Sequence, residues 1–149
     1  MKRRMLTILI PVYNEGPNIA PLFDALAPVL AQLEAQFDVE LLFTDNHSED
    51  DTFAQLQARG ERDPRVRVLR FSRNFGFQRS ILTGYLNARG DAAIQIDCDL
   101  QDPPALILQF VQRWLAGDKV VYGVRRSRKE GWLITVLRNN CQHYLISTA

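Results

Sequence analysis

The sequence has few cysteines and no long hydrophobic run. Its two cysteines, Cys98 and Cys141, lack the C-x-x-C spacing of a metal or redox site, so we expect a reducing, cytoplasmic compartment. No stretch approaches the roughly 18–20 consecutive apolar residues of a membrane-spanning helix. The apolar run from Leu6 to Val12 is short, contains Pro11 and lacks a cleavage site, so it is not expected to be a signal peptide.

Two glycine-rich nucleotide motifs are also missing. The chain reads Pro-Val-Tyr-Asn-Glu-Gly from Pro11 to Gly16, which is neither G-x-G-x-x-G nor G-x-x-x-x-G-K-[ST]. This argues against a dinucleotide cofactor and against a phosphate-loop nucleotidase. A tyrosine and a carboxylate, Tyr13 and Glu15, instead suit stacking on a nucleoside and hydrogen bonding to it.

The composition is that of an ordinary globular protein, with 46% hydrophobic and 23% charged residues in 149. This length favours a single domain. The net charge of +1 conceals an asymmetry. Residues 1–118 carry 12 basic and 16 acidic side chains, whereas residues 119–149 carry 6 basic side chains and 1 acidic one. The basic C-terminal part could contact phosphates or anionic lipid, or it could be a solvated helix face.

Short apolar runs alternate with longer segments of helical period. The runs are typical of strands buried on both faces, and we expect them at Leu6–Val12, Val39–Thr44, Val66–Phe71, Ala92–Ile96 and Lys119–Val124. Helical spacing predicts helices at Asn18–Gln36, Asp51–Arg59, Phe77–Ala88 and Pro104–Ala116. The alternation predicts an α/β fold, a mostly parallel Rossmann-like sheet with helices on both faces.

A further helix is predicted in the C-terminal segment, after the last predicted strand. Apolar residues spaced along Trp132–Ile146 predict an amphipathic helix, and the chain stops three residues later without a cap. We therefore expect residues 1–149 to be the N-terminal part of a longer protein.

Polar residues follow each predicted strand. In open parallel sheets, ligands bind outside the carboxyl ends of the strands, so these residues are the candidates for function. They are Tyr13, Asn14 and Glu15; Asp45 and Asn46; Arg73 and Asn74; Asp97, Asp99 and Gln101; and Arg125 and Arg126. Any one of these loops is unremarkable, and the prediction depends on their joint placement.

The fourth loop carries two carboxylates, Asp97 and Asp99, at the end of a buried strand. They would repel each other unless a cation lay beside them, and Mg²⁺ or Mn²⁺ prefers one or two carboxylates completed by phosphates and water. Gln101 could add a neutral oxygen. The alternative is a turn in which Asp102 caps the helix after Pro103. The arginines could grip phosphate or form an ordinary charged surface.

Several motifs together resemble glycosyltransferase family 2 and, within it, the polyprenyl-phosphate (dolichol- and undecaprenyl-phosphate) glycosyltransferases. The resemblance covers nearly the whole chain. The motifs are Ile10-Pro-Val-Tyr-Asn-Glu15, Asp45-Asn-His-Ser-Glu-Asp-Asp-Thr52, Arg73-Asn-Phe-Gly76, Asp97-Cys-Asp-Leu-Gln-Asp-Pro-Pro104 and Val121-Tyr-Gly-Val-Arg125.

This resemblance implies the GT-A nucleotide-diphospho-sugar transferase fold and an inverting transfer of sugar to a polyprenyl phosphate. It implies a UDP- or GDP-sugar donor, Mg²⁺ or Mn²⁺ as cofactor, no nucleic acid, and a protein associated with the cytoplasmic face of a membrane through a region absent here. The implied nucleotide-binding residues are Pro11, Tyr13, Glu15, Asp45, Asn46, Asp97 and Cys98; the implied metal ligands are Asp99 and Gln101; the implied catalytic residues are Asp97, Asp99 and Arg125.

One departure from the family pattern lies in the second loop. Family members commonly carry Asp-Asp-Gly-Ser where this chain has Asp45-Asn46-His47-Ser48, so donor preference stays open and His47 is either a substrate contact or a plain loop residue. Two further hypotheses remain. The acceptor could be a carbohydrate hydroxyl, which would need a general base elsewhere, or these residues could bind nucleotide sugar without turnover.

Overall fold

The computed structural model describes residues 3–124 and 143–147. The elements follow the order β1 (Met5–Val12), α1 (Gly16–Leu33), β2 (Asp38–Asp45), α2 (Thr52–Gly60), β3 (Val66–Arg70), α3 (Phe77–Asn87), β4 (Ala92–Gln95), α4 (Leu106–Leu115), β5 (Val120–Gly123) and β6 (His143–Ser147). The predicted alternation of strands and helices up to residue 124 is confirmed, with ends that differ by no more than three residues.

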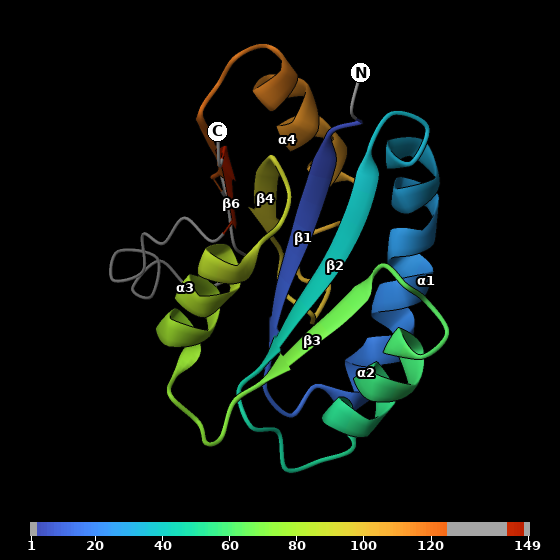
Figure 1. Cartoon of the computed structure of the whole chain (residues 1–149), viewed down its shortest axis with the longest axis vertical. Coiled ribbons are helices and arrows are strands. Elements are labelled where there is room, and N and C mark those ends of the chain that lie inside the picture. The colour runs from blue at the N-terminus through green and yellow to red at the C-terminus, as the bar shows by residue number, and fades with distance from the viewer. Residues whose placement is uncertain (1–2, 125–142, 148–149) are drawn as a thin grey trace, which may run out of the picture.

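One six-stranded sheet has the order β3-β2-β1-β4-β6-β5 (Figure 1). The first four strands are parallel to one another, whereas β6 runs antiparallel to both β4 and β5. The expectation of a mostly parallel sheet is therefore confirmed.

The predicted helix at Trp132–Ile146 is wrong over its last residues, because His143–Ser147 forms strand β6. Residues 132–142 lie outside the described part. Apolar spacing in so short a segment does not separate helix from strand, and β6 gains backbone hydrogen bonds from neighbours on both sides.

Helices cover both faces of the sheet. Phe43 of β2 stacks on Phe23 of α1 with ring centroids 5.7 Å apart, while the next residue, Thr44, accepts a hydrogen bond from Ser80 of α3. Because successive strand residues point to opposite faces, α1 and α3 lie on opposite sides of the sheet. Figure 1 shows this arrangement, with α2 on the side of α1.

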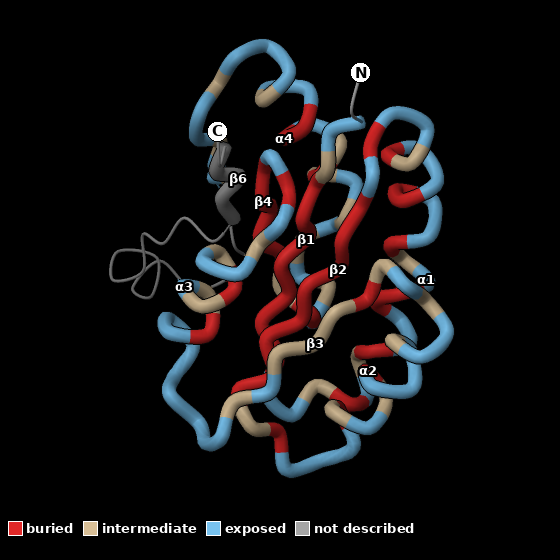
Figure 2. Tube along the Cα trace, in the orientation of Figure 1, coloured by how far each residue is buried: buried red, intermediate tan, exposed pale blue. Residues whose placement is uncertain are grey.

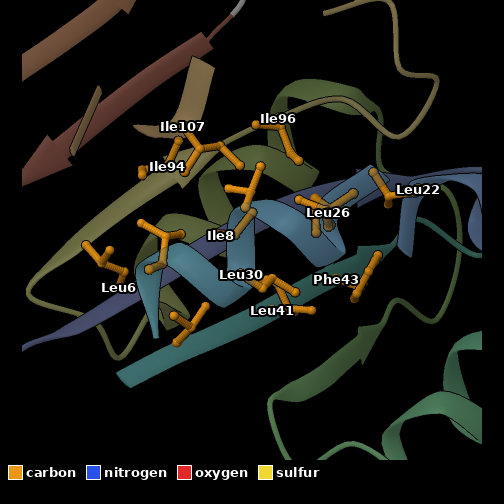
Figure 3. Packing of buried hydrophobic residues seen from close by; sticks show 14 of the residues in the cluster. Leu6, Ile8, Leu22, Leu26, Leu30, Leu41, Phe43, Ile94, Ile96 and Ile107 are labelled. Carbon is orange, nitrogen blue, oxygen red and sulfur yellow. The ribbon is translucent and has the colours of Figure 1, made fainter. Parts of the chain in front are cut away.

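The main core lies between the sheet and α1 with α4. Side chains of β1, β2 and β4 interleave there with those of the two helices, as Figure 3 shows for Ile8, Leu26, Leu41, Ile94 and Ile107. Burial is concentrated in the central strands, and the outer surfaces of the helices are exposed (Figure 2). A rigid sheet of this kind fixes the positions of the loops at its carboxyl edge. No described helix is both long and apolar enough to span a bilayer.

Candidate functional site

The loop after β1 lies between the loops that follow β2 and β4. Val12 is paired with Asp45 at the end of β2, and the Ile96 amide after β4 donates to Leu9 of β1 at 3.0 Å. The strand order changes direction at this point, because β2 lies on one side of β1 and β4 on the other. Such a topological switch point is where open α/β sheets bind ligands.

Hydrogen bonds tie the first loop to the second. The Asn14 amide donates to Ser48 Oγ at 2.9 Å, and the Glu49 amide donates to Asn14 Oδ1 at 2.8 Å. Asn14 has a φ of 54°, a left-handed conformation that asparagine tolerates better than most residues. The two loops are therefore held as one rim.

The start of α1 is capped by residues from the second loop. The Glu15 amide donates to Thr52 Oγ1 at 2.8 Å, and the Gly16 amide donates to Asp50 Oδ2 at 3.0 Å. Burial raises the pKa of the Asp50 carboxyl, but the hydrogen bonds from Thr52 and Gly16 outweigh it, so the pKa is lowered on balance. The first turn of α1, which begins next to Glu15, is thereby fixed in place.

Asp45 ends β2 as a wholly buried carboxylate. Its Oδ1 accepts a hydrogen bond from the Ser48 amide at 2.9 Å, and its Oδ2 lies 3.3 Å from Arg70 Nε. That ion pair supplies the charge partner that a buried carboxylate requires, although within the described chain Oδ2 has no hydrogen bond. Arg70 also donates to the Ser48 carbonyl at 3.1 Å and lies over the Phe53 ring.

Asn46 connects the second loop with the third. Its side chain is buried, Nδ2 donates to Asn74 Oδ1 at 2.9 Å, and Oδ1 accepts from the Phe75 amide at 2.9 Å. Asn74 Oδ1 accepts a further hydrogen bond from the Gly76 amide at 2.8 Å. Both ends of the Asn46 amide therefore position the Arg73–Gly76 segment.

His47 adopts a left-handed backbone conformation with a φ of 67°. This explains why a glycine is common at this position in the family pattern, because glycine reaches such a φ without steric cost. Its Nδ1 lies 3.1 Å from the Phe71 carbonyl oxygen. The imidazole thus has a partner in the loop, which supports the interpretation of His47 as a loop residue.

Carboxylates of the first and fourth loops both affect the Cys98 thiol. The Cys98 thiol is buried, and its pKa is raised to about 12, first by that burial and then by the negative charges of Glu15, Asp99 and Asp97. Glu15, which is distant from Asp97 and Asp99 in the sequence, thus acts on the same thiol as they do. Gln95 Nε2 donates to Asp97 Oδ1 at 3.0 Å.

The segment between the predicted metal ligands is a strained turn. Leu100 has a φ of 56°, which costs a branched residue roughly 1–2 kcal/mol, and the Gln101 amide donates to Asp99 Oδ1 at 3.1 Å. The turn brings Asp99 and Gln101 to the surface, and both are exposed. Strain of this kind is found preferentially at functional sites.

The oxygen ligands of this turn suit a hard divalent cation that a diphosphate would help to coordinate. Across residues 3–124 and 143–147, no group of three or more His, Cys, Asp or Glu side chains is arranged to hold a metal ion without such help.

The remaining predicted residues differ in exposure. Pro11 is buried in β1, Tyr13 is 41% exposed at the rim, and Arg73 lies over the Phe75 ring at 4.7 Å. Arg125 lies outside the described residues. The sequence motif Asp45–Thr52 includes Ser48, Asp50 and Thr52 but does not reveal their supporting roles, and Arg70 was missed, because each of the four acts on a residue distant in the chain.

The chain has the GT-A fold. It matches the structure of the mannosyltransferase PcManGT from Pyrobaculum calidifontis in complex with GDP-Man and Mn²⁺, with a TM-score of 0.68 and 21% sequence identity. The match covers 99% of this chain and 45% of that one. A profile described as glycosyl transferase family 2 matches residues 7–147.

Relatives of higher identity support the same assignment. The chain is 43% identical over 123 residues to the uncharacterized glycosyltransferase YkcC of Bacillus subtilis, covering 83% of this chain and 38% of the relative. It is 36% identical over 123 residues to the bactoprenol glucosyl transferase of Shigella phage SfV, and this match covers 83% of this chain and 39% of the relative. The chain belongs to glycosyl transferase family 2, and it spans about two fifths of the length of these curated relatives.

Proposed function

We propose that these residues are the donor-binding part of an enzyme that transfers a sugar, with inversion, from a nucleotide-diphosphate sugar to a polyprenyl phosphate. The observation that carries the proposal is that the loops after β1 and β4, which carry Glu15, Asp97 and Asp99, follow two directly paired parallel strands at the topological switch point. A UDP- or GDP-sugar would lie along this rim with its nucleoside near Tyr13 and the buried end of β2. Relatedness to a bactoprenol glucosyl transferase supports the lipid-phosphate acceptor.

In this proposal Asp99 and Gln101 would hold Mg²⁺ or Mn²⁺, which would stabilise the charge that develops on the departing diphosphate. The phosphate acceptor is already ionised near neutral pH, so an oxygen of that phosphate can attack the anomeric carbon with little help from a general base. The bond from the anomeric carbon to the nucleoside diphosphate breaks as the new bond forms on the opposite face. The chain's own contribution is then to position the donor and to hold the leaving group.

Cys98 and Asp97 have separate parts in this scheme. The Cys98 side chain is buried and its thiol stays protonated at neutral pH, so it is not a nucleophile here. Its backbone and the Asp97 carboxylate face the ribose side of the donor in our proposal. Arg125 would lie near the phosphates, as the family resemblance implies.

The donor site is tested by replacing Asp99 with alanine and titrating UDP and GDP calorimetrically with and without Mg²⁺ or Mn²⁺. We expect the metal-dependent part of the affinity to disappear. Asp24→Ala, which removes an exposed carboxylate from α1, is the matched control and should bind as the parent does. Equal metal-dependent affinity in the Asp99→Ala and Asp24→Ala proteins would refute the assignment.

The acceptor class needs its own assay. The full-length protein is incubated with a radiolabelled donor, chosen from a panel of UDP-, GDP- and dTDP-sugars, and with either a polyprenyl phosphate or a free sugar. Label in a lipid-extractable product supports the polyprenyl acceptor and a function at the membrane's cytoplasmic face. Label only in a soluble saccharide would favour a hydroxyl acceptor, and donor binding without any product would favour a binding module.

A further inference from the structure

The outward face of α3 is both apolar and basic. Ser80 and Gly84 pack toward the sheet, whereas Arg79, Leu82 and Leu86 lie on the opposite face at steps of three and four residues. Leu82 is 57% exposed and Leu86 is 77% exposed. Two large apolar side chains on one exposed helix face require an explanation, since such patches commonly mark interaction sites.

The apolar surface continues past the N-terminal end of α3. Phe75 is 37% exposed, and a hollow of about 370 Å³ lies beside it, lined by Phe71, Ser72, Phe75, Arg79 and Thr83. We call the surface formed by Arg73, Phe75, Arg79, Leu82, Leu86 and Arg89 the α3 strip. The helix α3 itself lies along one side of the molecule in Figure 1.

Charge on the α3 strip has one sign. Residues 71–90 contain three arginines, Arg73, Arg79 and Arg89, and no aspartate or glutamate, although the whole chain has a net charge of only +1. Exposed phenylalanine and leucine side chains among arginines fit a surface that is apolar inside and anionic outside. A lipid bilayer with anionic headgroups has that character, and the long arginine stems can lie along apolar surface while their guanidinium groups reach phosphate.

The strip is mechanically connected to the candidate site. The Phe75 amide donates to Asn46 Oδ1, and Asn46 Nδ2 donates to Asn74, so the N-terminal end of the strip is tied to the rim at the end of β2. An acceptor with its phosphate at the bilayer surface and its hydrocarbon tail within the bilayer can be reached only by a rim held close to that surface.

We propose that the α3 strip rests on a membrane surface that carries anionic lipid and thereby sets the candidate site beside the bilayer. This rests on the proposed function for its biological purpose, but the binding itself does not depend on the donor. Phe75, Leu82 and Leu86 enter the headgroup region, and Arg73 and Arg79 pair with lipid phosphates, whereas Arg89 lies 4.0 Å from Glu40.

The test is flotation of the chain with vesicles of phosphatidylglycerol and phosphatidylcholine in equal parts, compared with phosphatidylcholine alone. We expect Leu82→Glu/Leu86→Glu to lower partitioning onto the mixed vesicles at least about tenfold, because it replaces apolar contact by two like charges. Leu115→Glu on α4, where Leu115 is 42% exposed, is the matched control and should partition as the parent does. The basic residues 119–149 are the same in all three proteins, so their contribution cancels.

The electrostatic part is tested separately with Arg79→Gln, which should lower partitioning onto the mixed vesicles about fivefold and leave that onto neutral vesicles unchanged. Arg62→Gln, which removes an exposed arginine after α2, is its control. Hydrogen exchange should slow in residues 77–87 and not in residues 106–115 when mixed vesicles are added.

Equal partitioning of Leu82→Glu/Leu86→Glu and Leu115→Glu would overturn the proposal. So would a strip that is occupied by a second copy of the chain, revealed by a dimer in analytical ultracentrifugation that Leu82→Glu/Leu86→Glu dissociates. Calorimetric UDP or GDP binding without vesicles separates the two proposals. If the protein binds nucleotide but the α3 substitutions do not change vesicle partitioning, only the proposed membrane contact is rejected. Vesicle binding through α3 with no nucleotide binding rejects only the proposed function.

Discussion

Replacing Asn46 by aspartate tests whether this buried amide organises the rim. The substitution keeps the shape of the side chain and installs the carboxylate that is common at this position in the family pattern. In this protein Nδ2 donates to Asn74 Oδ1 at 2.9 Å, and an aspartate would place two oxygens at that distance with no proton between them. The hydrogen bond from the Phe75 amide to Oδ1 would remain.

The magnitude follows from these contacts. One buried hydrogen bond is lost and its partner oxygen faces a charge, which costs roughly 1–3 kcal/mol, and the retained Phe75 bond offsets part of it. Asn74 cannot simply turn its amide around, because its Oδ1 also accepts the Gly76 amide at 2.8 Å. We therefore expect Asn46→Asp to lower the free energy of unfolding by about 2 kcal/mol.

Urea unfolding followed by tryptophan fluorescence measures this change, and hydrogen exchange of residues 72–76 locates it. Asn87→Asp is the control, because Asn87 is exposed at the end of α3 and its Nδ2 donates to the Thr83 carbonyl at 2.8 Å, within the same helix. That change should lie within about 0.5 kcal/mol of the parent. If Asn46→Asp is as stable as Asn87→Asp and its loop amides exchange at the parent rate, our account of Asn46 is refuted.

Three further predictions concern other parts of the structure. His47→Gly should be more stable than His47→Ala by about 1 kcal/mol in urea unfolding, because only glycine relieves the φ of 67°; equal stability would argue against that backbone conformation. Burial raises the pKa of the Cys98 thiol from 9.0 to about 12, so between these two pKa values the folded protein keeps a proton that the unfolded chain has lost. The free energy of unfolding should therefore fall by about 1.4 kcal/mol per pH unit in that range. Cys98→Ala should lack this slope between pH 9 and 10, and identical slopes would contradict the burial. Gly84→Ala should cost about 1–3 kcal/mol, since its Cβ would lie 2.1 Å from Leu9 Cδ1, and a double-mutant cycle should show most of the cost gone in a Leu9→Ala background.

Much of the fold could be predicted because its signals are local. Runs such as Leu6–Val12 and Val39–Thr44 are mostly apolar on both alternating faces, which is typical of a parallel sheet covered on both faces, and the structure places both strands away from the sheet edges. Strand β6 could not be predicted, because its pairing with β4 and β5 depends on strands that lie far back in the chain.

The candidate site could likewise be predicted only in part. Its location followed from a general rule about carboxyl ends of strands, so Glu15, Asp97 and Asp99 were predicted to lie on one edge, and the loops that carry them follow β1 and β4, which pair in parallel. The supporting hydrogen bonds were not predictable. Ser48 and Arg70 stabilise residues brought near them only by the completed sheet, so even the motif that contains Ser48 does not reveal its partner.

The position of β6 has a consequence for how the chain assembles during synthesis. Strands β1 to β4 can pair as soon as they leave the ribosome, but β5 has no neighbour among the described strands until residues 143–147 emerge and insert beside it. Until then β4 presents an open edge to other chains, which is a recognised route to aggregation. A nascent protein halted between residues 124 and 142 should therefore depend on chaperones, and release of that dependence should coincide with the arrival of β6.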